Sequence, residues 1–111
     1  MSQHTIDPAT FAELQDTAGA EFAAELVATF LEEAPLMLTE LRAALAEAAT
    51  DRFRRAAHSL KSNGHTFGAT ALANLARELE LGGLPANEAP LLALEAEYAR
   101  AAAALSELSH G

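Results

Sequence analysis

Polar chemistry in this chain of 111 residues is concentrated in residues 56–68, on a background rich in alanine and leucine. His58 is followed three residues later by Lys61, the only lysine, and then by the small residues Ser62 and Gly64. A neutral imidazole is a good nitrogen nucleophile near neutral pH, so it can attack phosphorus and hold a phosphoryl group. Lys61, one helical turn away, would place a positive charge beside the phosphoryl oxygens.

A helix must present these residues on an exposed face. At about 100° per residue, one inward arc of a helix over residues 50–65 and its extension contains Phe53, Ala56, Ala57, Leu60, Gly64 and Phe67. His58 then points away from the core, on the same side as Arg54, Lys61, Ser62 and His65. With Arg52 and Arg55, these residues predict a local positive stripe on an acidic protein. The small residues after His58 would leave its imidazole uncovered for a close approach by another protein.

The remaining elements are also helical. Asp7 before Pro8 predicts a capped short helix over residues 8–17, and apolar spacing predicts a long helix over residues 20–49. Pro35 predicts either a kink in that helix or two shorter helices. Thr50 or Asp51 is the expected cap of the next helix, whose end is blurred by glycine and threonine near residue 65. Further helices are expected over residues 70–81 and 87–108.

These elements predict an all-α fold, an antiparallel up-down four-helix bundle with a short additional N-terminal helix. The whole chain, 1–111, is expected to form a single domain, with residues 1–6 and 109–111 as loose ends.

Composition excludes several classes of function. A formal charge of −9 argues against a nucleic-acid-binding protein, and the absence of cysteine excludes a disulfide framework or a thiolate zinc site. Neither a leader segment nor a run of about 18 apolar residues is present, so we expect a cytoplasmic protein without a membrane span.

Metal and enzyme chemistry are not favoured either. His58 and His65 would lie about 10 Å apart along a helix, and Ser62 between them is a poor zinc ligand. We therefore expect no metal and no intrinsic cofactor. The chain has no phosphate-binding glycine loop and no cysteine nucleophile, which indicates a phosphoryl carrier rather than an enzyme. The many glutamates, Glu78 and Glu80 among them, are expected to lie on solvated helix faces.

Residues 57–62, Ala-His-Ser-Leu-Lys-Ser, resemble the histidine-containing phosphotransfer (HPt) domain of bacterial two-component phosphorelays. The resemblance extends to Phe-Gly-Ala at 67–69, to Leu72 and Leu-Glu at 79–80, and upstream to Phe-Leu-Glu-Glu-Ala-Pro at 30–35, so it spans most of the chain. It implies that His58 accepts a phosphoryl group from a receiver-domain aspartate and returns it to another, while Lys61 balances the phosphate charge.

The same resemblance implies partners and further site residues. Receiver domains, a hybrid histidine kinase or both would dock around His58, and any Mg²⁺ needed for transfer would belong to the receiver. Ser62 stands where the family often has glycine, and His65 where many members have a small residue. Gly64 and Gly68 are expected to serve helix packing, and Leu31 or Met37 of the preceding helix could add docking contacts. The expected docking residues on the helix of His58 are Arg54, Ala57, Ser62 and His65.

Two alternatives remain open at this point. The bundle could be a non-catalytic docking or inhibitory module that binds a receiver or kinase without carrying phosphate. It could also be the phosphoacceptor domain of a larger chemotaxis-type kinase, although a chain that ends at Gly111 favours a separate carrier. We expect a monomer in either case.

Overall fold

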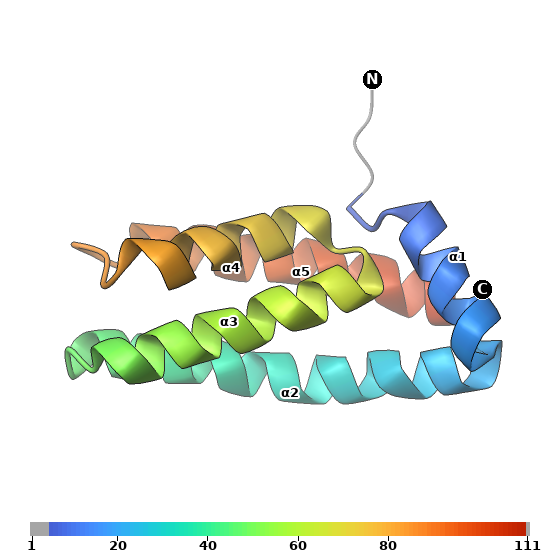
Figure 1. Ribbon diagram of the computed structural model, residues 1–111, viewed down its shortest axis with the longest axis horizontal. Helices are drawn as coiled ribbons and strands as arrows, with labels where there is room; N and C mark the ends of the chain where they lie inside the picture. The colour runs from blue at the N-terminus through green and yellow to red at the C-terminus, as the bar shows by residue number, and fades with distance from the viewer. Residues whose placement is uncertain (1–4, 111) are drawn as a thin grey trace, which may run out of the picture.

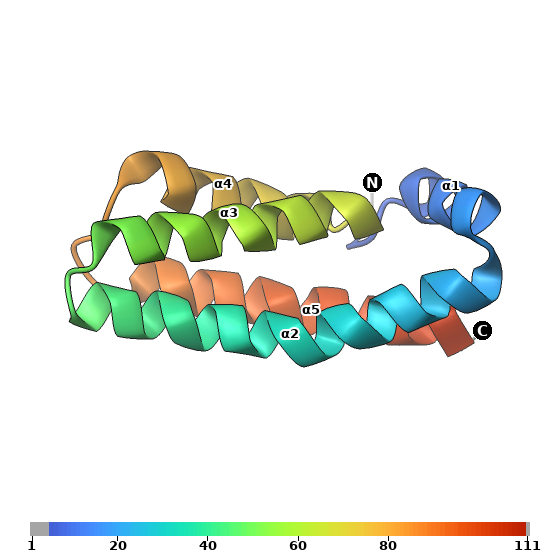
Figure 2. The same ribbon diagram turned by 60° about the horizontal axis from the view of Figure 1, so that its bottom comes forward.

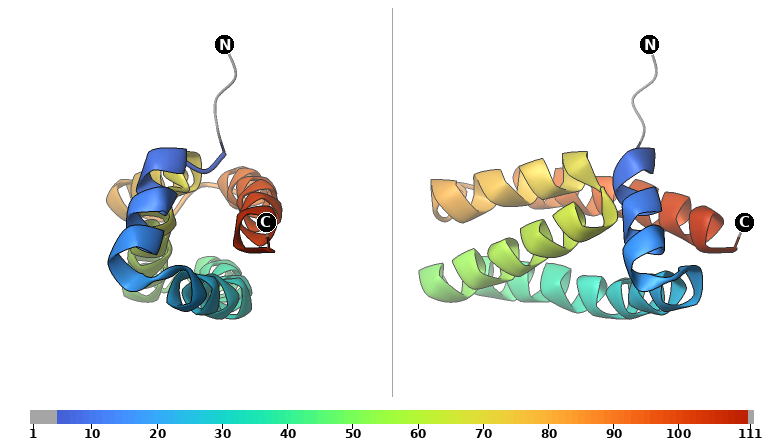
Figure 3. Two further views of the ribbon diagram at one scale, coloured as in Figure 1. Left: turned by 90° about the vertical axis from the view of Figure 1, so that its right-hand side faces the viewer. Right: turned by 45° about the vertical axis from the view of Figure 1, so that its right-hand side comes forward.

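The computed structural model describes residues 5–110, which form five helices and no strand. Four of them run lengthwise in an antiparallel bundle, and α1 lies across one end (Figures 1 and 3). Each long helix packs against two neighbours, because α3 contacts α2 and α4 while α5 contacts the same two helices. The predicted all-α bundle with a short N-terminal helix is confirmed. The helices are α1 (Pro8–Ala18), α2 (Ala20–Ala46), α3 (Thr50–Phe67), α4 (Thr70–Gly82) and α5 (Ala89–His110).

The start of α1 is attached to the bundle. The carboxylate of Asp7 accepts the Ala9 N–H at 3.2 Å, which confirms the predicted cap. The backbone N–H of Asp7 donates to the Gly68 carbonyl at 2.7 Å, and Ile6 is buried in the core. The expectation of a loose arm over residues 1–6 is therefore wrong at Ile6, because an apolar contact and a backbone hydrogen bond hold this end; residues 1–4 lie outside the described part of the chain.

Pro35 lies inside α2, which continues as one helix past it (Figure 2). Proline has no N–H, so the carbonyl of Leu31, one turn earlier, loses its helical donor. The hydroxyl of Tyr98 on α5 donates to that carbonyl at 3.4 Å, and Thr39 donates its hydroxyl to the Pro35 carbonyl at 3.0 Å. A neighbouring helix thus supplies a donor for the carbonyl that proline leaves free, and α2 is not divided into two helices.

Both ends of α3 differ from the prediction. Its N-cap is Ala49, and neither Thr50 nor Asp51 caps it through a side-chain hydrogen bond. Its C-terminus is sharply defined rather than blurred, because Gly68 adopts a left-handed conformation with φ 78°. In this capping motif the Ala69 N–H donates to the Gly64 carbonyl at 2.8 Å, and the Gly68 N–H donates to the His65 carbonyl at 3.2 Å.

The last helix is displaced from its predicted bounds at both ends. It begins at Ala89 rather than at residue 87, because the Asn87 side-chain oxygen accepts the Ala89 N–H at 2.9 Å and acts as a cap. It continues through Ser109 and His110, which we expected beyond its end. Within residues 5–110, no helix combines the length and apolar character needed to cross a bilayer.

The predicted inner face of α3 is confirmed, since every residue assigned to it is buried. The ring of Phe30 on α2 lies 5.1 Å from that of Phe67 and 5.9 Å from that of Tyr98, so aromatic contacts join α2, α3 and α5. These contacts fix the rotation of α3, and that rotation places its opposite face, which carries His58, toward solvent.

Gly64 of α3 lies in close contact with α4. A Cβ atom added at this position would lie 3.1 Å from the Cβ of Ala73 and 3.2 Å from its backbone nitrogen. No side chain larger than hydrogen fits without a shift of α4. The prediction of Gly64 as a packing residue is thus supported by its contacts.

Replacement of Gly64 by leucine should therefore destabilise the bundle by about 3 kcal/mol, the upper end of the usual cost of overpacking. Gly82→Leu is a matched control, because Gly82 is also helical but a Cβ there would meet nothing within 4 Å. Urea unfolding followed by circular dichroism measures both changes in the free energy of unfolding. Equal stability of the two variants would contradict the assigned packing role.

Candidate functional site

His58, Lys61 and Glu80 form a contiguous polar cluster between α3 and α4. The Nδ1 atom of His58 lies 2.7 Å from Oε2 of Glu80, and Nζ of Lys61 lies 2.8 Å from Oε1 of the same carboxylate. The His58 side chain is 57% exposed, whereas those of Lys61 and Glu80 are 22% and 14% exposed. The imidazole is thus accessible to a partner, while Glu80, which contacts it, and Lys61, which contacts Glu80, are partly shielded.

The protonation state of the cluster follows from its contacts. Lys61 and then His58 hold the pKa of the Glu80 carboxyl below its ordinary value, against the opposing effect of burial. Glu80 is therefore an anion at neutral pH and can only accept hydrogen bonds. Nδ1 of His58 must then be the donor, so a neutral ring carries its lone pair on Nε2.

Lys61 is engaged by Glu80 rather than free. The Oε1 atom of Glu80 is buried, and its contact with Lys61 is an ion pair whose alignment does not satisfy a hydrogen bond. The ammonium group is therefore held beside the site by this ion pair, and a second anion could compete for it.

Sequence reasoning missed Glu80, and its assignment to a solvated helix face is wrong. The antiparallel packing of α3 and α4, with Gly64 against Ala73, brings the outer parts of the two helices together. His58, ten positions before Gly68, there meets Glu80, twelve positions after it. Gly68 marks the turn between the two helices, but an equal count outward from it pairs His58 with Glu78, so the sequence alone does not single out Glu80.

The predicted docking residues fall into two groups. Arg54, Ser62 and His65 are exposed on α3, as expected. Ala57 is fully buried, so its predicted contact with a partner is wrong and its place is in the core. Gly64 is buried as well; its missing side chain makes room for α4 rather than for the approach of a partner to the imidazole.

The predicted positive stripe is largely neutralised. The Arg52 guanidinium binds Glu40 at 2.8 Å and Glu47 at 2.7 Å, and Arg54 lies 3.6 Å from Asp51. Lys61 is paired with Glu80. Within residues 5–110, Arg55 is the one cation of this stripe for which no ion pair is observed.

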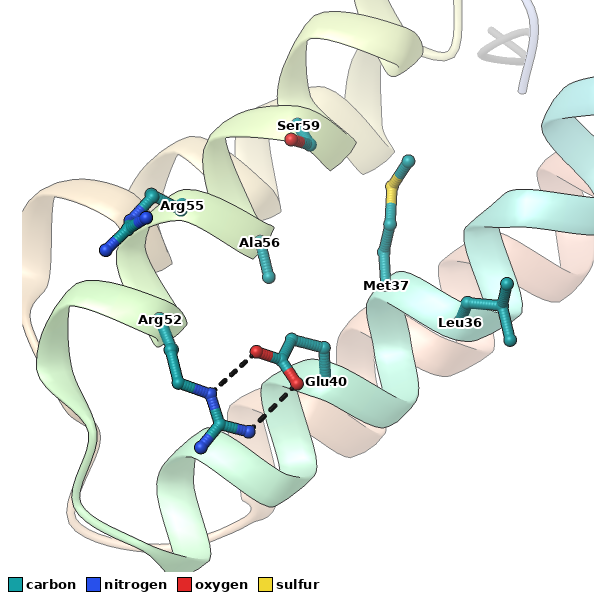
Figure 4. A pocket seen from close by; sticks show the side chains of 7 residues that line it. All are labelled: Leu36, Met37, Glu40, Arg52, Arg55, Ala56 and Ser59. Atoms are coloured by element: carbon teal, nitrogen blue, oxygen red, sulfur yellow. Dashed lines mark hydrogen bonds and ion pairs between the residues drawn. The ribbon is translucent and has the colours of Figure 1, made fainter.

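A groove of about 350 Å³ lies between α2 and α3 (Figure 4). Its apolar lining includes Leu36, which is 69% exposed, and Met37. Its polar edge is formed by Arg52 with Glu40 and by Arg55, and Ser59, the residue after His58, also lines it. The expectation that Met37 faces a partner-accessible surface is consistent with this position. Among the described residues, no three histidine, aspartate or glutamate side chains converge as ligands for a metal ion.

Comparison with known proteins points to one family. The family model described as the Hpt domain matches residues 25–104, which include His58, Lys61 and Glu80. Among solved structures, the chain is similar to histidine-containing phosphotransfer protein B (HptB) from Pseudomonas aeruginosa PAO1, with a TM-score of 0.90 and 26% sequence identity. The similarity covers 98% of this chain and 97% of that one. No curated protein sequence matches significantly.

Proposed function

Since the chain belongs to the Hpt domain family and is a histidine phosphotransfer protein of two-component phosphorelays, we propose that His58 carries its phosphoryl group. One observation supports this assignment above the others. His58 is exposed, and Glu80 occupies Nδ1, so Nε2 is the ring nitrogen left to face a phosphoryl donor.

The transfer needs no base from this chain. The Nε2 lone pair attacks phosphorus, and the bond between phosphorus and the aspartate oxygen of a receiver breaks, with its electrons passing to the receiver carboxylate. The ring takes up positive charge, which is stabilised by the negative charge of the Glu80 carboxylate, whose Oε2 lies 2.7 Å from Nδ1. Transfer to a second receiver reverses these changes.

Hpt domains are phosphotransfer carriers, and they interact with receiver domains and kinases in phosphorelays. We propose that this chain acts between receiver aspartates without a complete active site of its own. The Mg²⁺ ion that such a transfer requires would be held by the receiver. A monomeric state and a cytoplasmic location are part of the same proposal.

The central assignment is tested by incubation with a phosphorylated receiver domain. The wild-type protein should acquire acid-labile label, whereas His58→Gln, which keeps a polar side chain of similar length, should acquire none. His65→Gln is the matched control and should still acquire acid-labile label, because His65 lies on the same face without the contact to Glu80; its loss can change the rate of docking but does not remove the phosphoacceptor. Equal labelling of His58→Gln and the wild type would refute the assignment. A protein that binds the receiver yet takes no label would instead be a docking module.

Lys61 would balance the charge of the phosphoryl group. In the unphosphorylated protein it is paired with Glu80, and the phosphoryl oxygens would compete for its ammonium group. Lys61→Ala should fold normally and slow transfer about ten- to a hundredfold, because a charge-assisted contact contributes roughly 1.5–3 kcal/mol. Unchanged transfer kinetics would remove this role.

The docking surface would extend from His58 along α3 and over the groove beside α2. Ser62 is small and exposed one turn after His58, so the receiver backbone can come close to the site there. Arg55 at the groove edge could pair with an acidic side chain of the receiver. Arg54 and His65 are exposed on the side of α3 that carries His58 and would add polar contacts. Met37 and Leu36 would meet apolar residues of that partner.

Ser62→Phe should therefore block transfer from a receiver by obstructing its approach. The same variant should still be labelled at the wild-type rate by phosphoramidate, a donor small enough to reach Nε2 without docking. Ser62→Ala serves as the control and should behave like the wild type with both donors. If Ser62→Phe accepts phosphate from the receiver as fast as Ser62→Ala does, Ser62 lies outside the docking surface.

A further inference from the structure

Glu80 contacts both functional side chains through one carboxylate. Oε2 lies 2.7 Å from His58 Nδ1, and Oε1 lies 2.8 Å from Lys61 Nζ. Only 14% of the Glu80 side chain is exposed, so the carboxylate is itself partly shielded from water, while the His58 side chain is 57% exposed. A glutamine at this position would accept the same hydrogen bond without the negative charge. The charge therefore needs a separate explanation from the hydrogen bond.

We propose that Glu80 is a positioning residue that keeps the proton on Nδ1 of His58 while the phosphoryl group is bound, so that the group leaves from a protonated ring. This inference rests on the proposed role of His58 as phosphoacceptor and deepens it. It concerns how readily the carrier releases its phosphoryl group.

The chemical reason lies in the leaving group. When the N–P bond breaks, its electrons return to Nε2. A ring that has kept its Nδ1 proton departs as neutral imidazole, whereas a ring that has lost this proton must depart as an imidazolide anion. The anion is a far poorer leaving group. A carboxylate beside Nδ1 favours the protonated, positively charged ring, because opposite charges at this distance attract strongly in a partly shielded site.

The other charged groups around the ring do not supply this contribution. The nearby cations Arg52, Arg54 and Lys61 are each paired with a carboxylate, so they neither stabilise the protonated ring nor replace Glu80. Glu80 is the one carboxylate observed in contact with the imidazole among the described residues, and Lys61 draws on the same carboxylate. The charged or titratable groups nearest in sequence or packing are Arg54, Arg55, Lys61 and His65 on α3, Arg77 and Glu78 beside Glu80 on α4, and Glu40 with Arg52 at the α2–α3 contact.

The test is the pH profile of outward transfer. Wild type, Glu80→Gln and the control Glu78→Gln are phosphorylated, and the rate of transfer to an unphosphorylated receiver domain is measured at saturating receiver from pH 6 to pH 9. Ratios between variants cancel the titration of the receiver itself. Glu78→Gln removes the same charge from an exposed neighbouring position of α4, with no contact to the imidazole.

We expect the ratio of the Glu78→Gln transfer rate to the wild-type rate to stay constant over this pH range. The ratio of the Glu80→Gln transfer rate to the wild-type rate should fall as the pH rises. The fall is at most tenfold per pH unit, in the pH range where the ring of the variant has lost its Nδ1 proton and the wild-type ring still holds it. In the phosphorylated protein labelled with ¹⁵N-histidine, the Nδ1 titration should occur at lower pH in Glu80→Gln than in the wild type. Thermal unfolding checks that both variants are folded.

A constant ratio for Glu80→Gln over this pH range, or an unchanged Nδ1 titration, would overturn the inference. Both results presuppose a protein that takes up label at His58. If His58→Gln is labelled like the wild type, the proposed function fails instead, so the two failures are distinguishable.

Discussion

The close contact of α3 and α4 at Gly64 is the constraint on which the site depends. The Gly64 backbone lies against Ala73, and this approach sets the spacing and register of the two helices. Ten residues from the turn on one side and twelve on the other, His58 and Glu80 then come within hydrogen-bonding distance. A larger side chain at Gly64 would push α4 away, so the chemistry of the imidazole depends on a contact two helical turns from it.

The electrostatics of the site are determined by nearby ion pairs rather than by the net charge of the protein. The protein carries a formal charge of −9, yet its phosphoryl chemistry is proposed for a face on which most cations are already paired with carboxylates. Such pairs hold a cation near the site without leaving a strong positive field that would attract unrelated anions. An incoming phosphoryl group would meet Lys61 held in place by Glu80, and an imidazole whose Nδ1 is already oriented.

Much of the fold and part of the site could be predicted from the sequence. The inner face of α3 follows from the 3.6-residue period, and that face determines that His58 is exposed. The role of Glu80 could not be found in the same way, because it depends on the register between two helices rather than on the pattern within one. Ala57 was predicted both on that inner face and as a docking residue. The inner-face prediction was right and the docking prediction wrong, because Ala57 lies about 100° around the helix from His58 and is buried.

Helix ends were predicted less well because they depend on tertiary contacts. Gly68 ends α3 through backbone hydrogen bonds, and its carbonyl also accepts a hydrogen bond from the Asp7 N–H. A count of helix-breaking residues does not reveal these contacts. The continuity of α2 past Pro35 likewise depends on Tyr98, a residue far away in sequence.

The position of the phosphoryl group is the most direct test of this account. The protein, labelled with ¹⁵N at its histidine ring nitrogens and phosphorylated by a receiver domain, can be examined by ¹⁵N and ³¹P NMR. We predict a single N–P bond at Nε2 of His58, with a proton retained on Nδ1. A phosphoryl group on Nδ1 of His58, or on another histidine such as His65, would contradict it.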